Sequence, residues 1–240
     1  MGRDENITHE MMAYYNERAQ EYDDIYRGKG HVTLDSSVYQ QDVTKTSEMA
    51  SGFGKGHLID IACGTGFWLP KYARNCCKIT LLDQSEKMLN ECTKRVEQLG
   101  LIKLTNFIQG EFFEVKLEPA TFDSALVGFI LSHFTFEQEN SFFLRLRRIL
   151  KPNSQLMIID SAWNKERQKY NMKEGTQERV LNDGRRFKIF KRYFEQSDIE
   201  EMANRYNFTI NSCYIGKAFI VAIFERRSTQ EKLPILGITL

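Results

Sequence analysis

Apolar and polar positions follow two alternating patterns along the chain. Short apolar runs, typical of strands buried on both faces, occupy residues 58–61, 78–83, 104–109, 122–129 and 155–160. Stretches with apolar residues at helical spacing lie between most of these runs, at residues 67–74, 85–99 and 136–150. Because parallel strands need a crossover connection, usually a helix, the alternation predicts a doubly wound α/β fold with a mostly parallel sheet.

The two ends of the chain depart from this alternation. Residues 8–26 and 34–49 have helical spacing and predict two N-terminal helices. Near the other end, residues 187–190 predict a strand, residues 195–206 a helix, and residues 208–214 and 218–224 a hairpin that closes the sheet edge. This hairpin brings the predicted sheet to seven strands. The stretch 163–186 is polar and weakly periodic, and no element is predicted there.

Composition and charge exclude several classes of protein. The chain has 240 residues with 33 Lys and Arg against 32 Asp and Glu, so its net charge of +1 does not indicate a polyanion binder. No apolar run approaches the roughly 20 residues of a membrane-spanning helix, and the N-terminus lacks a signal-peptide core. The five cysteines include no Cys-x-x-Cys pair, so we expect neither a disulfide framework nor a metal site. A reduced, cytoplasmic location fits this composition.

A glycine-containing turn follows the apolar run at residues 58–61. Gly64 and Gly66 allow the backbone to turn tightly and to approach a ligand, and the helix after them directs its free N–H groups toward the same place. Leu69 stands where the third glycine of a dinucleotide fingerprint belongs. Asp60 lies in an otherwise apolar strand end, and Asp83 ends the next strand, where an acid accepts the hydroxyls of a ribose. The turn therefore predicts a nucleotide-like cofactor, although glycines also serve tight βα turns for structural reasons alone.

Four segments in order resemble a known family. Residues 60–66 (DIACGTG), 82–88 (LDQSEKM), 122–126 (FDSAL) and 150–153 (LKPN) are similar to successive signatures of the class I S-adenosylmethionine-dependent methyltransferases. Residues 14–23 are similar to the lid helix of the members that act on small molecules. The resemblance covers residues 12–160 and implies a Rossmann-like methyltransferase fold. Asn153 replaces the usual glycine of its turn, and asparagine tolerates the left-handed conformation.

The resemblance also implies a cofactor, S-adenosylmethionine, with S-adenosylhomocysteine as its product. It implies that the turn 62–66 runs beneath the amino-acid portion, that Asp60 helps to hold the amino group, and that Asp83 binds the ribose. Glu111 stands where the family usually has aspartate at the adenine edge. The full set assigned to the cofactor is Tyr15, Arg18, Asp60, Ala62, Cys63, Gly64, Gly66, Asp83, Gln84, Met88, Gly110, Glu111, Phe112 and Phe129.

His133 is the candidate general base, since the loop after the fourth strand faces the reaction centre in this architecture. The alternative is that His133 only packs or caps at the start of the next helix. Tyr15, Arg18 and Tyr22 share one face of the first helix, where Arg18 is expected to pair with the cofactor carboxylate. The alternative is that the tyrosines only pack this helix onto the rest of the protein.

A basic segment follows the fifth predicted strand. Residues 165–192 contain ten Lys and Arg against four Asp and Glu. In the family, an insertion here commonly covers the substrate, so a basic cover indicates an anionic small molecule or the phosphates of RNA. The third interpretation is a solvated surface loop. Trp163, Tyr170 and Tyr193 are candidates for lining a pocket.

We expect one methyltransferase domain over residues 1–240. Its expected parts are a helical lid (1–50), a cofactor-binding core (57–160), a substrate-covering insertion (161–192), and a helix with an edge hairpin (193–227). The predicted function is methyl transfer to a small-molecule acceptor by in-line displacement, with no nucleic-acid or membrane partner. An RNA-modifying methyltransferase, a non-catalytic cofactor-binding protein and a dinucleotide oxidoreductase are the alternatives. The sequence does not identify the acceptor or the oligomeric state.

Overall fold

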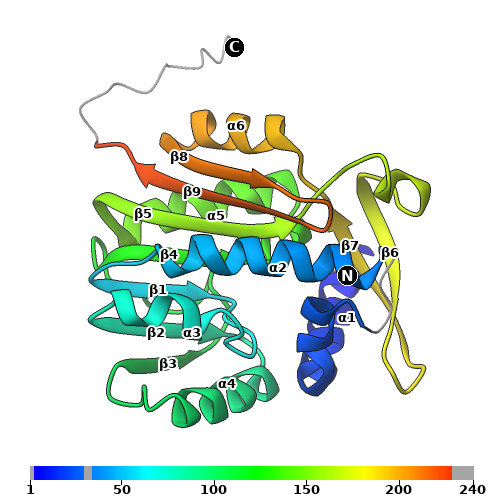
Figure 1. Ribbon diagram of the computed structural model, residues 1–240, viewed down its shortest axis with the longest axis horizontal. Helices are drawn as coiled ribbons and strands as arrows, with labels where there is room; N and C mark the ends of the chain where they lie inside the picture. The colour runs from blue at the N-terminus through cyan, green and yellow to red at the C-terminus, as the bar shows by residue number, and fades with distance from the viewer. Residues whose placement is uncertain (1–2, 30–33, 229–240) are drawn as a thin grey trace.

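A computed structural model describes residues 3–29 and 34–228. Its main sheet has seven strands in the order β3-β2-β1-β4-β5-β9-β8 (Figure 1). The strands are β1 (His57–Ile61), β2 (Lys78–Asp83), β3 (Thr105–Gln109), β4 (Phe122–Gly128), β5 (Leu150–Ser161), β8 (Phe208–Ile215) and β9 (Phe219–Arg226). The first five run parallel, while β9 pairs antiparallel with β5 and β8. The predicted doubly wound sheet with an antiparallel edge hairpin is confirmed.

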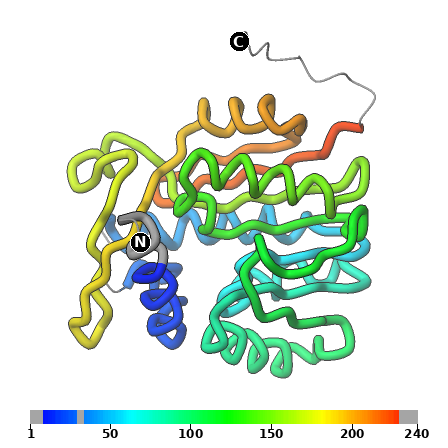
Figure 2. The backbone as a smooth tube through the Cα atoms, turned by 180° about the vertical axis from the view of Figure 1, so that it is seen from behind, coloured from blue at the N-terminus to red at the C-terminus, as the bar shows by residue number. Residues whose placement is uncertain are grey.

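Helices cover both faces of this sheet. The helices α2 (Ser36–Ser51), α3 (Leu69–Tyr72) and α4 (Glu86–Gln98) pack on one face, and α5 (Phe136–Ile149) and α6 (Gln196–Arg205) pack on the other. Figure 1 has α2 in front of the sheet, and Figure 2 shows α5 on the opposite side. Along β1, Leu58 joins one core while Ile59 and Ile61 join the other. A strand buried on both faces therefore explains the continuous apolar run.

The N-terminal segment differs from its prediction. A single helix over residues 8–26 is wrong, because α1 (Arg3–Glu17) ends before Arg18 and a 3₁₀ helix, η1 (Ala19–Arg27), follows. The 3₁₀ helix buries Ala19 and Tyr26 and ends at Gly28, whose φ is +63°. Tyr26 packs among Phe67, Trp68 and Phe129. Packing against the β1 turn thus outweighs the continuous helical pattern.

Two predictions fail in the second half of the chain. The stretch without a predicted element contains β6 (Glu174–Val180), which pairs with β7 (Arg186–Arg192) as a separate antiparallel ribbon. The pattern missed β6 because polar residues occupy both of its faces. Residues 151–153, predicted as a turn, lie inside β5, where Asn153 has φ +57° and the β4–β5 register shifts between Phe122 and Ser124.

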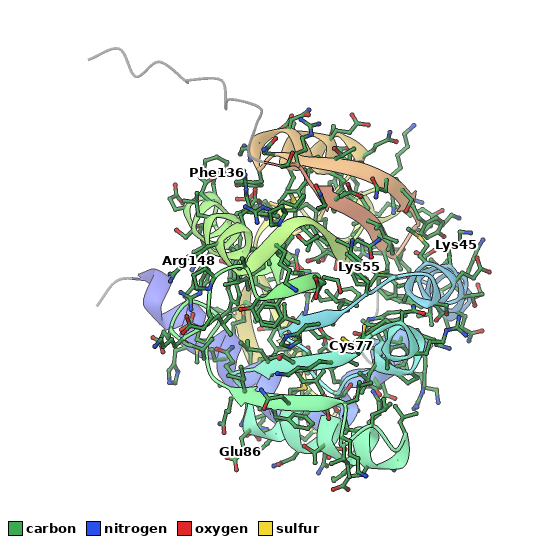
Figure 3. The ribbon with its side chains drawn as sticks, turned by 90° about the vertical axis from the view of Figure 1, so that its left-hand side faces the viewer. Lys45, Lys55, Cys77, Glu86, Phe136 and Arg148 are labelled. Atoms are coloured by element: carbon green, nitrogen blue, oxygen red, sulfur yellow. The ribbon has the colours of Figure 1, made fainter. Side chains whose placement is uncertain are left out.

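The ribbon and α1 lie together at one end of the sheet. Figures 1 and 2 show α1 beside β6 and β7, near the carboxyl ends of the parallel strands. The rings of Tyr14 and Phe187 are 5.6 Å apart, and the backbone N–H of Lys188 donates to Glu10 at 2.8 Å. Figure 3 views the opposite end, where Lys55 and Cys77 precede β1 and β2. Among the described helices, none is long and apolar enough to cross a bilayer.

Candidate active site

The first pocket lies at the carboxyl ends of β1, β2 and β4, beneath α1. Most of the residues assigned to a cofactor from the sequence line it, namely Tyr15, Ala62, Gly64, Asp83, Gln84, Met88, Gly110, Glu111, Phe112 and Phe129. Tyr22 and His133 line it as well. Apolar residues that the sequence reasoning did not select complete its wall, among them Met11, Met12, Phe113, Ile130 and Phe134.

The β1 turn gives the pocket its floor through unusual backbone conformations. Ala62 and Phe129 both have φ in the left-handed region, at +56° and +57°, at the ends of β1 and β4. Such conformations are costly for residues with a side chain, and they often occur at functional sites. Gly64 lines the pocket with φ +54°. Gly66 is not part of this pocket's lining, and glycine is required there because a Cβ would lie 2.7 Å from the Cys92 Sγ.

Asp83 presents a buried carboxylate at the end of β2. Its Oδ2 accepts the backbone N–H of Gly64 at 2.9 Å, and its Oδ1 accepts that of Ser85 at 2.9 Å. Burial raises the pKa of Asp83 from its ordinary value, while the two N–H groups counteract that rise. Because each ionised oxygen accepts more than one hydrogen bond, both retain capacity for a diol in the pocket.

Asp60 lies in a small adjoining pocket with Cys63, behind the β1 turn. Its Oδ2 accepts the Tyr72 hydroxyl at 2.6 Å, whereas its Oδ1 is buried without a partner. Burial raises the pKa of Asp60 to about 7, with the Tyr72 hydrogen bond opposing and the Asp83 charge adding to the rise. A buried carboxylate oxygen without a donor favours a cationic ligand group at this position.

His133 and Tyr15 form a hydrogen-bonded pair at the edge of the first pocket. The Tyr15 hydroxyl lies 2.7 Å from His133 Nε2, and His133 Nδ1 lies 2.7 Å from the carbonyl oxygen of Phe190. A carbonyl only accepts, so Nδ1 carries the proton and Nε2 accepts from Tyr15. Burial, followed by the nearby Lys191 charge, holds the pKa of His133 well below its usual range. His133 is therefore neutral, and it lies in a 3₁₀ turn (Leu131–His133) before α5.

The second pocket adjoins the first beneath the β6–β7 ribbon. It shares Tyr15, Tyr22 and Phe129 with the first pocket. Its other walls carry basic and tyrosine side chains from distant parts of the chain: Tyr14, Arg18, Lys29, Tyr39, Arg167, Arg179, Lys191 and Tyr193. Arg18, assigned from the sequence to the cofactor carboxylate, lines this second pocket and not the first. Its guanidinium lies over the rings of Tyr14 and Tyr22, at 5.5 and 5.2 Å from their centroids.

The sequence identifies the basic segment as a whole but does not distinguish which of its cations line the second pocket. Of the aromatic candidates, Tyr193 lines the second pocket, while Tyr170 is exposed and Trp163 is not part of its lining. Buried positions Ile189, Lys191 and Tyr193 alternate on β7 and its extension. This two-residue period appears in the burial and not in the hydrophobic pattern of the sequence, because Lys191 occupies an inward position.

The site contains the features that an adenosylmethionine molecule requires. Asp83 supplies acceptors for a ribose in the first pocket, which also has many apolar lining residues, and Asp60 supplies a buried acceptor for an ammonium group in the small adjoining pocket. Among the described residues, no group of three or more His, Cys, Asp or Glu is arranged to hold a metal ion.

Comparison with known proteins agrees with this geometry. Residues 59–158 match the model of a family described as "Methyltransferase domain". A ubiquinone/menaquinone biosynthesis C-methyltransferase, UbiE, of Blochmanniella floridana is 27% identical over 126 residues, which are 51% of this chain and 48% of that protein. The UbiE of Blochmanniella pennsylvanica is 30% identical over 106 residues, 43% of this chain and 41% of that protein. The matches thus span about half the length of these curated relatives or less.

Solved structures share the fold over nearly the whole chain. A structure titled "DhpI-SAM-HEP complex" has a TM-score of 0.73 at 21% identity and covers 93% of this chain and 99% of that chain. A 1,6-didemethyltoxoflavin-N1-methyltransferase of Burkholderia thailandensis has a TM-score of 0.63 at 13% identity and covers 95% and 92%. At these identities the likeness concerns the fold.

Proposed function

We propose that this chain is a class I S-adenosylmethionine-dependent methyltransferase and that it transfers a methyl group to a small-molecule acceptor. Asp83 would hold the ribose of the cofactor, Asp60 its amino group, and Glu111 with Phe112 the adenine side. When bound, adenosylmethionine supplies a methyl group already activated on a sulfonium. The protein's own task is therefore to position the acceptor and exclude water.

The observation that carries the proposal is the shared wall between the two pockets. Tyr15, Tyr22 and Phe129 line both, so a molecule in the second pocket would lie next to the cofactor site. In-line displacement needs this adjacency, because the attacking atom must approach from the side opposite the leaving group.

We infer that α1 and the ribbon act as a cover that keeps water from the reacting atoms. Glu17 of α1 pairs with Lys87 of α4 at 2.6 Å and with Arg185 at 2.9 Å. Asp23 pairs with Arg95 at 2.6 Å and accepts the Thr65 hydroxyl at 2.6 Å. These contacts join the N-terminal segment to both the ribbon and the core, which supports a closed cover over residues of the two pockets.

The charges of the basic segment support a small acceptor over RNA. Five of its ten cations, Lys173, Arg185, Arg186, Lys191 and Arg192, form ion pairs with carboxylates. Arg167 and Arg179 line the second pocket together with Lys191. Only Lys165, Lys169 and Lys188 are left for an outer surface, which is few for a phosphate-binding face.

Two measurements test this function. Calorimetric titration should give saturable binding of adenosylmethionine and adenosylhomocysteine. A methylation screen of a metabolite extract with labelled adenosylmethionine should then label a small molecule. Binding of the cofactor without any labelled product would favour a non-catalytic protein, and labelling of bulk tRNA with a steep salt dependence would favour the RNA alternative.

A further inference from the structure

The second pocket contains positive charges without negative partners. Among the described side chains, no carboxylate forms an ion pair with Arg18, Arg167 or Arg179, although other cations of the basic segment do. Arg167 is 6% exposed. Burying an unpaired charge is costly, so a protein that keeps one usually provides it with a partner.

The unpaired polar atoms of the pocket lining are donors. Arg167 Nη2 donates to the carbonyl oxygen of Ala218 at 3.1 Å, but its Nε–H is buried without an acceptor. The side-chain amide nitrogen of Asn171, also in the lining, is buried without an acceptor too. A ligand rich in acceptor oxygens would satisfy both groups.

The lining residues have a net positive charge. Five cations (Arg18, Lys29, Arg167, Arg179 and Lys191) face two carboxylates (Glu21 and Asp24), a surplus of three. Asp160, outside the lining, lies 3.6 Å from Lys191 and offsets part of this surplus. Burial alone would raise the pKa of Tyr193, but the charges of Lys191, Arg179 and Arg167 outweigh it and lower that pKa. The pocket lining therefore carries a net positive charge of two to three.

Aromatic rings fix several of these cations in place. The Arg167 guanidinium lies 4.6 Å from the centroid of the Tyr193 ring, and the Lys191 ammonium lies 5.8 Å from the same ring. Arg18 is held between Tyr14 and Tyr22. Cations held over rings lose little freedom on binding, and a guanidinium offers the fork of donors that matches a carboxylate or phosphoryl group.

We propose that the second pocket binds a small molecule with at least two negative charges on oxygen, held by Arg18, Arg167, Arg179 and Lys191. The shared chemistry is a polyoxyanion, either a dicarboxylate or a phosphoryl group. The assignment of this anion as the methyl acceptor rests on the proposed function. The binding itself does not.

Calorimetry at constant ionic strength tests the proposal with defined probes. Glutarate, butyrate and glutaramide have similar size but carry two, one and no negative charges, while methylphosphonate and inorganic phosphate represent the phosphoryl class. We expect at least one dianion to bind about tenfold or more tightly than butyrate, and glutaramide not to bind. A preference for glutarate identifies the carboxylate class, and a preference for methylphosphonate identifies the phosphoryl class. Equal binding of glutaramide and glutarate, or no dianion binding, overturns the proposal.

Two variants localise the binding. Arg179→Gln removes a half-buried lining charge, and it should weaken the dianion by about tenfold while leaving adenosylhomocysteine binding unchanged. Arg186→Gln removes an exposed charge from the same ribbon, outside the lining, and should leave both affinities unchanged. Adenosylhomocysteine binding also verifies folding, and Arg179→Met, which removes the same charge and keeps an unbranched side chain, replaces the first variant if that binding is lost. Equal weakening by Arg186→Gln means an adventitious charge effect only, and it overturns the proposal.

The proposed anion site and the proposed methyltransferase function can be refuted independently of each other. Adenosylhomocysteine binding without dianion binding removes this inference and leaves the proposed function standing. Dianion binding without adenosylhomocysteine binding removes the proposed function and leaves the pocket.

Discussion

The Tyr15 hydroxyl donates a hydrogen bond of 2.7 Å to Nε2 of His133, across 118 positions of sequence. The partner on the other ring nitrogen, the Phe190 carbonyl, belongs to the ribbon. One histidine therefore joins the N-terminal helix to the ribbon, at the boundary between the two pockets. Burial, then the neighbouring tyrosines, raises the pKa of Tyr15 well above its usual value, so this hydroxyl remains a donor.

This pair predicts a positioning role that kinetics can separate from cofactor binding. Replacing His133 with Ala removes the acceptor that orients Tyr15, and Tyr15→Phe removes the oriented hydroxyl. Each is expected to lower kcat about tenfold to a hundredfold, with the adenosylhomocysteine Kd within about twofold. Because the two side chains act as a unit, the double variant should be no worse than the poorer single variant.

The exposed Tyr170→Phe is the matched control and should behave as the wild type. Turnover unchanged in both His133→Ala and Tyr15→Phe would end the proposed role. Fully additive losses would mean that the residues act separately.

His133 also predicts how stability depends on pH. Its folded pKa lies well below its usual range, whereas in the unfolded chain it titrates near about 6.5. Above the unfolded pKa, a histidine that is neutral in both states leaves the free energy of unfolding at its full value. As the pH falls below about 6.5, the unfolded state binds a proton that the folded state does not, so the free energy of unfolding decreases. The free energy of unfolding, measured with urea at pH 8 and pH 5.5, should fall less in His133→Gln than in the wild type. An equal fall in both proteins would contradict this assignment.

The sequence predicted the core of the site better than its cover. Asp60, Gly64 and Asp83 lie in short segments, namely a strand end, a tight turn and a helix start. The residues of each segment are sufficient to predict its conformation. Arg18 was assigned to the cofactor because helical spacing placed it beside Tyr15 and Tyr22. The structure places it in the second pocket, since the chain changes from α to 3₁₀ geometry after Glu17.

The ribbon shows why the cover resists prediction. Its inward residues, such as Arg179 and Lys191, are polar because they face a pocket and not a core. Hydrophobic patterning therefore cannot distinguish them from solvated residues such as Lys169. Only the pairing of β6 with β7, and the packing of β7 against α1, determine which cations face inward.

Two carboxylates of the first site predict separable effects on different parts of one ligand. Asp60→Asn removes the buried negative charge assigned to the amino group while retaining an acceptor for Tyr72. It should weaken adenosylhomocysteine by about tenfold to a hundredfold and leave methylthioadenosine, which lacks the amino-acid portion, unchanged. Asp83→Asn should weaken both ligands by similar factors, because both contain the ribose. Calorimetric titration of the two ligands against the two variants measures all four effects.

The exposed Glu118→Gln should change neither affinity and is the control. Weaker methylthioadenosine binding in Asp60→Asn would show that Asp60 acts on the turn as a whole. Unchanged binding of both ligands in Asp83→Asn would remove the ribose assignment.

Gly66 predicts a stability cost with an identified steric source. Alanine at this position must adopt φ +70°, and its Cβ would lie 2.7 Å from the Cys92 Sγ in the core beneath the turn. The left-handed backbone costs about 1–2 kcal/mol, and overpacking adds about 1–3 kcal/mol. Gly100 is the matched control, because its φ is +69° but a Cβ there would meet no atom of the described residues within 4 Å, its chain neighbours aside. Gly100→Ala should therefore lose only the backbone part of the free energy of unfolding in urea.

The double variant Gly66→Ala with Cys92→Ala identifies the clash itself. Removing the Cys92 sulfur relieves the overlap, so the combined loss of unfolding free energy should be smaller than the sum of the two single losses, by about 1 kcal/mol or more. Additive losses would show that Cys92 is not the obstacle. Equal losses in Gly66→Ala and Gly100→Ala would show that the backbone conformation alone requires glycine after β1, and that the close approach of α4 to the turn contributes nothing to that requirement.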